Sequence, residues 1–565
     1  MAKLSTVSPR RLNRRSLVGG SAALAGTALL GRSASAQDAT PAAGDRVLTP
    51  DDIPGPMHSY PLVQEKKTFT AMVPSYGTEW IDNDMTRWYE ERTGVHIEWQ
   101  VVQSEGAIQQ LNLALASGDY PDIIFGFNWA PFDLTMSAIA AYGAQGIFVP
   151  LNDYLEDNAP HLLTHVSQEY PIAMEIVTLP DGTIYSMPYV NDCYHCQFWD
   201  QRMWIHSGWL ETLGLSMPET TDDLVEVLTA FRDGDPNGNG EQDEYPLTAE
   251  VSKSLTTYLV NPFTHSPGTP WLYFDDSGEL TATYLHEGFF EAAEYLAGLS
   301  EQGLLDAEAF TRDYDGLRRL GNAPDGSQIG MVPSGWREFI QAVDGEPGEW
   351  TEYALMPPLV GPDGNRRVDR DFDEPHHGNV FVITDKCDDP ALAVAWADGL
   401  YEFEATMRAV DGVPGREWRF AEDGEIGVDG RPALWTRIPT DPGPEGANQT
   451  RTWNQLGPSY RSSSIRLGQA VLAEPELNGE VILYTETKNK LEPYASGPET
   501  DLRRPVFTPE AAGRIVELET PITQLVEATF AQIATGQGGP SWEDFQSQLQ
   551  SLGVDEYLQL YAESQ

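Results

Sequence analysis

The first part of the chain alternates strand-like and helix-like segments, and this alternation limits the fold more than any other feature. Short apolar runs rich in β-branched residues are separated by amphipathic runs that stop at Gly94 and Gly118. In order, the segments are KTFTAMVPSY (67–76), DNDMTRWYEERTG (82–94), VHIEWQVV (95–102), EGAIQQLNLALASGD (105–119) and PDIIFGF (121–127). Strand–helix–strand–helix–strand at this spacing predicts a parallel α/β sheet with right-handed crossovers.

Two loops of this predicted sheet are expected to face a ligand. In open α/β sheets, ligands bind in the crevice beyond the carboxyl ends of the strands. The loops SYGTEW (75–80) and GFNWAP (126–131) follow two of the predicted strands. They supply Trp80, Asn128 and Trp129 as candidate ligand-binding residues, with capping of the sheet edge as the structural alternative.

Size and charge restrict the class of protein. A chain of 565 residues is too long for one hydrophobic core, so two or more lobes are expected. The hydrophobic content of 41% is that of a folded protein. The formal net charge of -51 would repel phosphate backbones and anionic lipid headgroups. We therefore expect no nucleic-acid or membrane-surface partner.

The N-terminal segment has the features of an export signal. Residues 1–36 contain a basic start, an apolar run from Leu17 to Leu30 and a small-residue cleavage site ending at Ala36. The Arg14–Arg15 pair resembles a twin-arginine export signal. Residues 37–60, rich in Ala, Pro, Asp and Gly, read as a flexible leader. The sequence thus predicts a secreted protein that works outside the cytoplasmic membrane.

Two of the three cysteines form a closely spaced pair. Cys193-Tyr-His-Cys196 is compatible with a structural disulfide or buried thiols, with a position that shapes a pocket, or with part of a metal site. A metal site would need further ligands, for which His195 and His206 are the nearest candidates. The surrounding segment, CYHCQFWDQRMWIH (193–206), is predicted as an aromatic-rich strand.

An acidic loop follows a predicted helix and has the spacing of a calcium site. In DGDPNGNGEQDE (233–244), side-chain oxygens recur at positions 1, 3, 5 and 9 of an EF-hand pattern, and Gly240 stands at position 6, where the chain must turn sharply. The Glu241 carbonyl falls at position 7, and Glu244 at position 10 is the nearby carboxylate that could close the shell. The candidate calcium ligands are Asp235, Asn237, Asn239, Glu241, Asp243 and Glu244. An ordinary Asx-rich turn is the alternative.

The region around this loop resembles a known family. WIHSGWLETLGLSMPETTDDLVEVLTAFRDGDPNGNGEQDEYPLT (204–248) is similar to a segment of the extracellular solute-binding proteins of bacterial ABC importers, in the branch that includes oligoalginate-binding proteins and related lipoproteins. Further segments resemble the same branch, in order along the chain: GIFVPLNDYLEDNAP (146–160), DGTIYSMPY (181–189) and SWEDFQSQLQSLGVDEYLQLY (541–561). Two features depart from the pattern, namely the missing lipid-anchor cysteine and the Cys193–Cys196 pair.

The resemblance implies a two-lobed α/β clamshell with a hinge, which closes on a sugar or oligosaccharide and presents it to a membrane permease. It also implies a monomer without catalytic activity and a structural calcium ion bound by the six loop residues given above. The expected lobe boundaries are 61–190 and 331–405 for the first lobe, with 191–330 and 406–565 for the second lobe and its C-terminal helices.

Sugar binding needs aromatic faces for stacking and polar side chains for the hydroxyl groups. Predicted loops and crossing segments supply further candidate ligand-binding residues, namely Asp192, Tyr194, His195, Trp336, Arg337 and His376. Core packing or surface capping is the alternative for each. For an acidic sugar, Arg337 and the His376–His377 pair are the candidate cations.

A secreted, calcium-dependent glycan hydrolase is the rival interpretation, because it would share the export signal, the aromatic residues and the calcium loop. Such an enzyme needs two carboxyl groups roughly 5 to 9 Å apart in its pocket. With 86 acidic residues, the sequence does not exclude such a pair. It contains no G-x-S-x-G, H-E-x-x-H or P-loop motif, and we favour the binding protein.

Overall fold

The computed structural model describes residues 48–104, 106–127, 134–250, 255–342, 345–372, 376–438, 449–502, 505 and 507–565. All of these belong to one compact unit, Ala42–Gln565. The predicted export signal (1–36), much of the predicted leader, and Asn128 and Trp129 lie outside the described residues.

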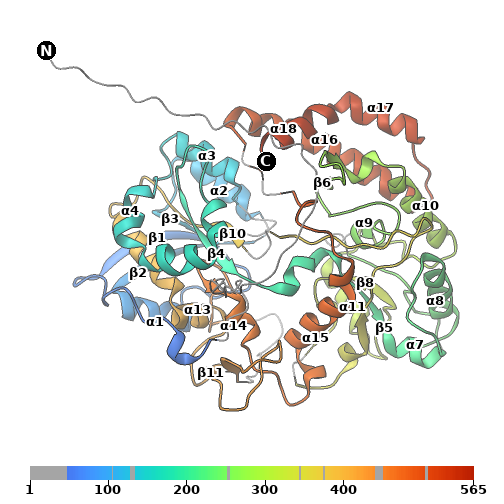
Figure 1. Cartoon of the computed structure of the whole chain (residues 1–565), viewed down its shortest axis with the longest axis horizontal. Coiled ribbons are helices and arrows are strands. Elements are labelled where there is room, and N and C mark those ends of the chain that lie inside the picture. Colours follow the sequence, from blue (N-terminus) through green and yellow to red (C-terminus); the bar gives the residue numbers. More distant parts are fainter. Residues whose placement is uncertain are drawn as a thin grey trace, which may run out of the picture. The chain divides into compact units, whose positions relative to one another are not determined.

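The largest sheet has six strands in the order β13-β4-β10-β3-β1-β2 (Figure 1). Its strands are β1 (Lys67–Pro74), β2 (Val95–Val102), β3 (Ile123–Phe125), β4 (Ser186–Asn191), β10 (His376–Ile383) and β13 (Tyr460–Arg461). β1 pairs in parallel with β2 and β3, and β13 pairs in parallel with β4. β10 is antiparallel to both of its neighbours, β3 and β4. The α/β prediction is confirmed, but one reversed strand makes the sheet mixed rather than wholly parallel.

Local sequence signals account for the helices that follow β1 and β2. Helix α1 (Asp84–Thr93) begins after Asn83, whose side chain accepts a hydrogen bond from the Met85 amide, and ends at Gly94 in the left-handed conformation. Helix α2 (Ala107–Ser117) ends at Gly118 in the same way. Both helices end at the glycine that the sequence predicted as their end. Helices α3 (Met136–Ala144), α4 (Asn152–Asn158), α5 (Ser167–Glu169), α6 (Pro171–Glu175), α12 (Pro390–Asp398), α13 (Phe403–Val410) and α14 (Ser463–Leu467) complete this region.

A second, antiparallel sheet has the strand order β8-β5-β9. Its strands are β5 (Met203–His206), β8 (Met331–Pro333) and β9 (Tyr353–Leu355). The predicted strand over 193–206 is wrong in its first part, where residues Tyr194–Gln201 form a kinked 3-10 helix before β5 begins. A disulfide closes a tight turn there, and an alternation of aromatic residues does not reveal such a constraint.

The remaining elements surround this smaller sheet or form short hairpins. The helices are α7 (Ser207–Leu213), α8 (Thr221–Asp233), α9 (Leu255–Tyr258), α10 (Gly288–Glu301), α11 (Tyr314–Gly321), α15 (Gly479–Glu486), α16 (Pro509–Ala534), α17 (Trp542–Leu552) and α18 (Val554–Glu563). The hairpins pair β6 (Leu272–Phe274) with β7 (Leu280–Ala282), and β11 (Trp418–Phe420) with β12 (Trp435–Arg437). In the described ranges, no helix combines the length and apolarity needed to cross a bilayer.

Buried hydrophobic side chains gather in separate clusters, as expected for a chain of this length. The largest cluster is built on the six-stranded sheet, and a second one joins β5 to α8, α10 and the C-terminal helices. The lobe boundaries remain predictions, but strand pairing places three segments differently from them. β8 and β9, predicted with the first lobe, pair with β5, while β13, predicted with the second, pairs with β4.

An aromatic cluster fixes the segment around Trp453 against the six-stranded sheet. Trp453 lies 5.5 Å from Phe125 of β3 and 5.7 Å from both Trp80 and Trp99, measured between ring centroids. Trp453 is 1% exposed and Trp80 is fully buried. Tilted and edge-on contacts between such rings stabilise a packed core beyond the area they bury. The next residues of the chain, up to Gly457, therefore pass directly over the end of β3.

The close passage of Gly457 over β3 generates a stability prediction. A Cβ atom at Gly457 would lie 2.1 Å from the Phe125 ring, whereas one at Gly430, which has a similar positive φ, would meet nothing within 4 Å. Gly430→Ala should lower the free energy of unfolding by about 1–2 kcal/mol through its left-handed backbone. Gly457→Ala should cost about 1–3 kcal/mol more because it also overpacks the core.

Denaturant unfolding of the two variants measures this difference. Equal losses would show that the Phe125 ring yields freely, and that the segment is not fixed against the sheet.

Candidate functional site

The carboxyl ends of five strands that run in the same direction lie at one edge of the six-stranded sheet. β1, β2, β3, β4 and β13 end at Pro74, Val102, Phe125, Asn191 and Arg461. We call this edge the carboxyl edge. Because ligands of open α/β sheets bind beyond such ends, it is the candidate functional site. The loop after β1 leaves from this edge as predicted, and so does the chain at Gly126 after β3.

Trp80, a predicted ligand-binding residue in the loop after β1, points into the core. Its side chain is fully buried, and its ring nitrogen donates a hydrogen bond to the Pro74 carbonyl oxygen at 3.2 Å. Its ring lies 4.8 Å from that of Trp99. This packing corresponds to the structural alternative given for Trp80. The sequence could not separate the two because the residue after a strand can turn toward either side of the edge.

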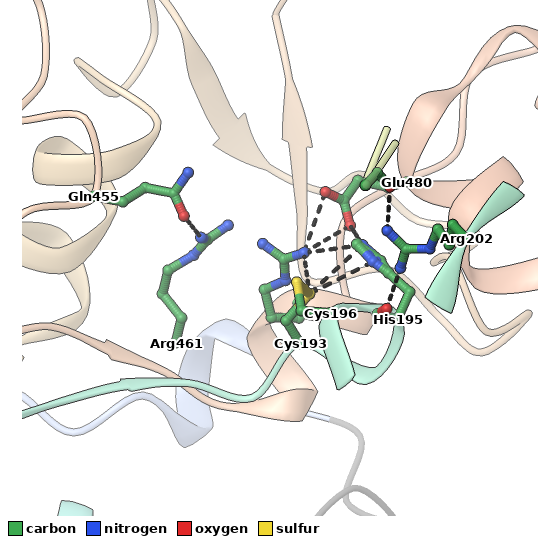
Figure 2. Close-up of a disulfide and its surroundings, with 9 residues drawn as sticks. Cys193, His195, Cys196, Arg202, Gln455, Arg461 and Glu480 are labelled. Atoms are coloured by element: carbon green, nitrogen blue, oxygen red, sulfur yellow. Dashed lines mark hydrogen bonds and ion pairs between the residues drawn. A yellow bond between two sulfur atoms is a disulfide. The ribbon is translucent and has the colours of Figure 1, made fainter. Parts of the chain in front are cut away.

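The chain that leaves β4 carries the Cys193–Cys196 pair as a disulfide (Figure 2). His195 lies between the two cysteines, with its ring nitrogens 3.5 and 3.6 Å from the Cys193 sulfur. Burial lowers the pKa of His195 well below its usual value, and the charges of Arg202 and Arg466 lower it further, so the ring is neutral at pH 7.

Metal binding at this cysteine pair has no support in the disulfide form. Cys193, His195 and Cys196 are the one group of three or more His, Cys, Asp or Glu ligands within 4.8 Å of one another in the described part of the chain. Zinc coordination uses cysteine as thiolate, and these two sulfurs are bonded to each other.

A buried ion pair lies against the disulfide, and Figure 2 labels its acidic member, Glu480. The Arg466 guanidinium donates to Glu480 at 3.0 Å and to the Cys193 sulfur at 3.2 Å. The side chain of Arg466 is 9% exposed and that of Glu480 is 26% exposed. Arg466 follows β13 and Glu480 begins α15, so this pair joins segments that share no local sequence signal.

A second buried arginine links the disulfide segment to the loop after β8. Arg202 is 1% exposed and donates hydrogen bonds to the carbonyl oxygens of His195 and Gly335. Burial lowers the pKa of Arg202 to about 10, against the attraction of Glu338 and other carboxylates, so it still carries its charge at pH 7. Through these bonds, the structure brings the predicted residues His195 and Trp336 into neighbouring loops.

Trp336 and Arg337 belong to an aromatic cluster of the smaller sheet. Trp336 is half-buried, with its ring 5.7 Å from that of Trp204. Arg337 is 4% exposed, lies 4.7 Å over the Trp204 ring and donates to the Tyr353 carbonyl oxygen. Burial lowers the pKa of Arg337 to about 10, and two of its nitrogens have no hydrogen-bond partner among the described residues.

The other predicted ligand-binding residues also lie near the carboxyl edge. Asp192 follows β4 and accepts a hydrogen bond from the Tyr170 hydroxyl at 2.8 Å, while burial raises its pKa. Tyr194 is half-buried, 5.3 Å from the Tyr484 ring. His376 begins β10, where its backbone pairs with Val190. All three positions lie near the carboxyl edge, and their contact with a ligand remains a prediction.

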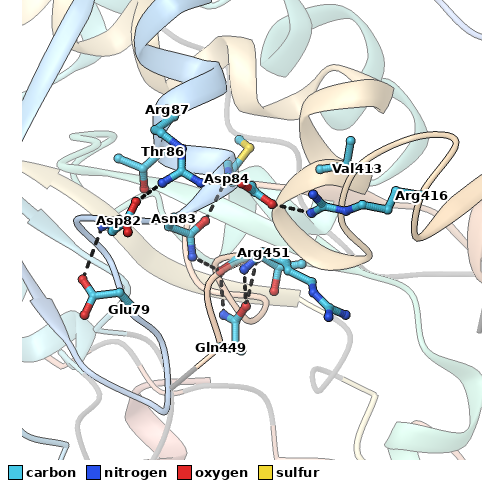
Figure 3. Close-up of polar contacts among 12 residues, drawn as sticks. Glu79, Asp82, Asn83, Asp84, Thr86, Arg87, Val413, Arg416, Gln449 and Arg451 are labelled. Carbon is cyan, nitrogen blue, oxygen red and sulfur yellow. Dashed lines mark hydrogen bonds and ion pairs between the residues drawn. The ribbon is translucent and has the colours of Figure 1, made fainter. Parts of the chain in front are cut away.

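Figure 3 shows how the segment 449–452 is tied to the loop after β1 and to the start of α1. The Glu79 amide donates to the Gln449 carbonyl oxygen at 3.0 Å, and the Asn83 side chain donates to the Thr452 carbonyl oxygen at 2.8 Å. Arg416 binds the Asp84 carboxylate at the same place. These bonds fix two segments that are far apart in sequence beside each other at the carboxyl edge.

The predicted calcium loop has converging side chains. The side-chain amides of Asn237 and Asn239 both donate to one Asp243 oxygen at 3.1 Å, and the Gly240 amide donates to Asp235 at 3.1 Å. Asp235 has a φ of 45° and Gly240 a φ of 81°, so the loop turns as tightly as the spacing predicted. Of the predicted ligands, Glu241 is exposed and offers its backbone carbonyl.

Glu244 gives the strongest sign that a cation fits this loop. Both of its carboxylate oxygens are buried without a hydrogen-bond partner among the described residues. Burial raises the pKa of Glu244, and the nearby charges of Asp243 and Asp235 raise it further. Hydrogen bonds from Gln328, Asn237 and Asn239 hold the pKa of Asp243 below its usual value in spite of burial. A bound cation would satisfy the Glu244 oxygens and offset the repulsion.

Sequence reasoning missed the residues that tie the carboxyl edge together. These are Arg202, Arg461, Arg466, Gln455 and Glu480. Arg461 is 4% exposed and donates to the Gln455 side chain at 2.9 Å. The sequence shows which arginines stand beside aromatic residues, but it does not show which of the 35 basic residues are buried.

The Arg466–Glu480 pair generates a second stability prediction. Glu480→Gln leaves a buried guanidinium without its counter-charge, so the free energy of unfolding should fall by about 2–4 kcal/mol. This loss is in the lower part of the range for buried ion pairs because Glu480 is partly exposed. Glu556→Gln is the matched control. It removes one of two carboxylate partners of Arg514, in a pair whose side chains are 43% and 48% exposed, and should change stability little.

Chemical denaturation of both variants measures these effects. Equal, small losses would contradict the buried character of the Arg466–Glu480 pair.

Comparisons with known proteins agree with this architecture. A family model described as bacterial extracellular solute-binding protein matches residues 64–406. The fructooligosaccharide ABC transporter substrate-binding protein FusA of Streptococcus pneumoniae serotype 4 is 27% identical over 520 residues, which cover 88% of this chain and 90% of that protein. The polygalacturonan/rhamnogalacturonan-binding protein YtcQ of Bacillus subtilis is 22% identical over 295 residues, 52% of this chain and 54% of that protein.

Solved structures show the same fold. FusA in complex with kestose has a TM-score of 0.72 at 24% identity, covering 88% of this chain and 98% of that one. An EF-hand mutant of FusA in complex with fructo-nystose gives the same values. The alginate-binding protein AlgQ2 without calcium ion has a TM-score of 0.64 at 20% identity, covering 89% and 98%. Since the family model spans more than half of the sequence, this chain belongs to the bacterial extracellular solute-binding protein family.

Proposed function

We propose that this chain is the substrate-binding subunit of an ABC importer, which captures an oligosaccharide outside the cytoplasmic membrane and delivers it to a permease. The observation that carries the proposal is its similarity to FusA over nearly the full length of both chains. The carboxyl edge adds physical support, because aromatic and polar side chains of the kind that bind sugars lie in the loops around it.

Capture would work by closure of two lobes around a hinge. The separate hydrophobic clusters on the six-stranded and three-stranded sheets support two lobes. Given the pairing of β8 and β9 with β5, we place the return to the first lobe at β10 rather than at residue 331. The chain would act as a monomer without catalysis, after export directed by residues 1–36.

Binding and turnover assays test this function. Calorimetry of the purified chain against neutral and acidic oligosaccharides should give one-to-one binding of at least one glycan. Prolonged incubation should leave that glycan intact, because no catalysis is proposed. X-ray scattering should show a smaller radius of gyration with the bound glycan, because closure makes the chain more compact.

Steady release of shorter sugars would favour the glycan hydrolase instead. An unchanged radius with a bound glycan would rule out closure.

We also propose that the loop from Asp235 to Glu244 holds a structural calcium ion. Several oxygens at this spacing suit calcium, which accepts six to eight oxygen ligands in a flexible shell. The partnerless Glu244 oxygens support the proposal, and the ion would neutralise carboxylates that otherwise repel one another. Its role would be to pin the loop between α8 and the strand region that follows.

Chelation tests the calcium proposal. Because calcium binds only the folded loop, saturation at about 100 times its dissociation constant should stabilise the fold by about 2.7 kcal/mol. EDTA should therefore lower the melting temperature, and calcium should restore it. Asp243→Ala should abolish the difference between the two conditions, whereas Gln242→Ala, an exposed change in the same loop, should preserve it.

Thermal melts with and without EDTA give the measurement. Identical melting temperatures for the wild-type chain would leave the Asx-rich turn as the correct interpretation.

A further inference from the structure

Two tight turns of the same unusual kind lie side by side at the carboxyl edge. In the first, the Thr78 amide donates to the Ser75 carbonyl oxygen, and Tyr76 and Gly77 between them have φ values of 39° and 69°. In the second, the Leu456 amide donates to the Trp453 carbonyl oxygen across a pair of residues that also have positive φ. Positive φ at both central positions is the pattern of a type I′ turn, which favours Gly and Asn.

Two of the residues in these turns, Tyr76 and Gln455, are poor choices for that backbone. Besides Tyr76, the second turn contains Asn454 with a φ of 52° and Gln455 with a φ of 67°. Three of the five non-glycine residues with positive φ in the described ranges therefore lie at this one place. For residues other than Gly and Asn the left-handed conformation costs free energy, and such strain is concentrated at ligand sites, where side-chain identity matters more than stability.

The two turns are bound to each other. The Asn454 side-chain amide donates to the Tyr76 carbonyl oxygen at 2.8 Å, and the Gln449 amide donates to the Gly77 carbonyl oxygen at 3.0 Å. The buried Arg461 side chain donates to the Gln455 side-chain oxygen at 2.9 Å. Both turns are thus held rigidly, and preorganised groups of this kind bind a ligand without paying for their own ordering.

Tyr76 combines exposure with a dense protein surrounding. Its side chain is 39% exposed, one of the larger exposures among the aromatic residues described. Desolvation by the surrounding protein nevertheless raises the pKa of Tyr76, and the charge of Glu338 adds to the rise. The exposed part of the Tyr76 ring is therefore accessible to a ligand.

We propose that Tyr76, Asn454 and Gln455 form a subsite that binds one uncharged sugar residue of the oligosaccharide, with the sugar ring stacked on Tyr76. This inference rests on the proposed function and assigns residues and a ligand class to it. The bonds described above leave the Asn454 side-chain oxygen as an acceptor and the Gln455 side-chain nitrogen as a donor, as hydroxyl groups require. We call these three residues the Tyr76 subsite.

Charge at the subsite favours an uncharged sugar over a uronate. The carboxylate whose charge reaches Tyr76 is that of Glu338, which accepts hydrogen bonds from Ser334 and the Trp336 amide. A uronate stacked on Tyr76 would bring its own carboxylate toward Glu338 and be repelled. The buried Arg461 is bonded to the Gln455 side chain and is attracted toward Asp411 and Glu480.

Calorimetry with matched neutral and acidic trisaccharides tests the subsite. The wild-type chain should bind kestose at least 10-fold more tightly than trigalacturonate. Tyr76→Ala should weaken kestose binding by about 10-fold or more, since loss of a buried aromatic contact in a binding site costs well over 1 kcal/mol. Tyr76→Phe, which keeps the ring, should bind kestose about 10 times more tightly than Tyr76→Ala. Glu338→Gln should reduce the ratio of kestose affinity to trigalacturonate affinity, because it removes the carboxylate that repels the acidic sugar.

Phe420→Ala is the matched control. Phe420 is an aromatic residue with a similar exposure of 41%, on β11 away from both turns, and its removal should leave the affinity unchanged. Circular dichroism and thermal melts verify that each variant is folded. Equal kestose affinity of Tyr76→Ala and the wild-type chain, or a wild-type preference for trigalacturonate, would overturn the subsite while leaving the proposed function intact. A wild-type chain that binds no oligosaccharide at all would overturn both.

Discussion

The packing of Trp453 among Trp80, Trp99 and Phe125 is the interaction on which the candidate site depends. It places a segment from the C-terminal part of the chain over the end of β3, where Gly457 is the residue that fits against the Phe125 ring. Aromatic rings bury large areas and contact one another in specific orientations, so the cluster fixes position as well as stability. This packing holds the turn at 453–456 beside the turn at 75–78.

Buried arginines connect this sheet to the rest of the chain. Arg202 joins the disulfide segment to the loop after β8, and Arg466 joins the end of β13 to α15 through Glu480. Such groups cost free energy to desolvate, and they persist where their bonds fix loops in one arrangement. A binding protein has this need, because hydroxyl groups of a sugar are recognised only by donors and acceptors held at defined positions. The strained backbone at Tyr76 and Gln455 is consistent with the same need for groups held at defined positions.

Local signals made several features predictable. The glycine stops at Gly94 and Gly118, the strand 95–102 and the turn chemistry of the calcium loop all depend on residues within a few positions of one another. The orientation of Trp80 and the reversal of β10 depend instead on distant partners. β10 returns to the sheet after residues 192–375 and enters between β3 and β4 in the opposite direction, for which no neighbouring residue gives a sign.

The sequence by itself determined that this is an α/β protein with more than one core, a loop suited to calcium and a resemblance to solute-binding proteins, because periodicity, glycine placement and ligand spacing act over short stretches of chain. Tertiary structure alone decided which of the candidate residues face the carboxyl edge. It buried Trp80, linked Cys193 to Cys196, and brought Asn454 to Tyr76 across nearly four hundred residues. The physical reason is that long-range contacts depend on the burial and hydrogen bonding of the whole fold. No single segment of the sequence specifies such contacts.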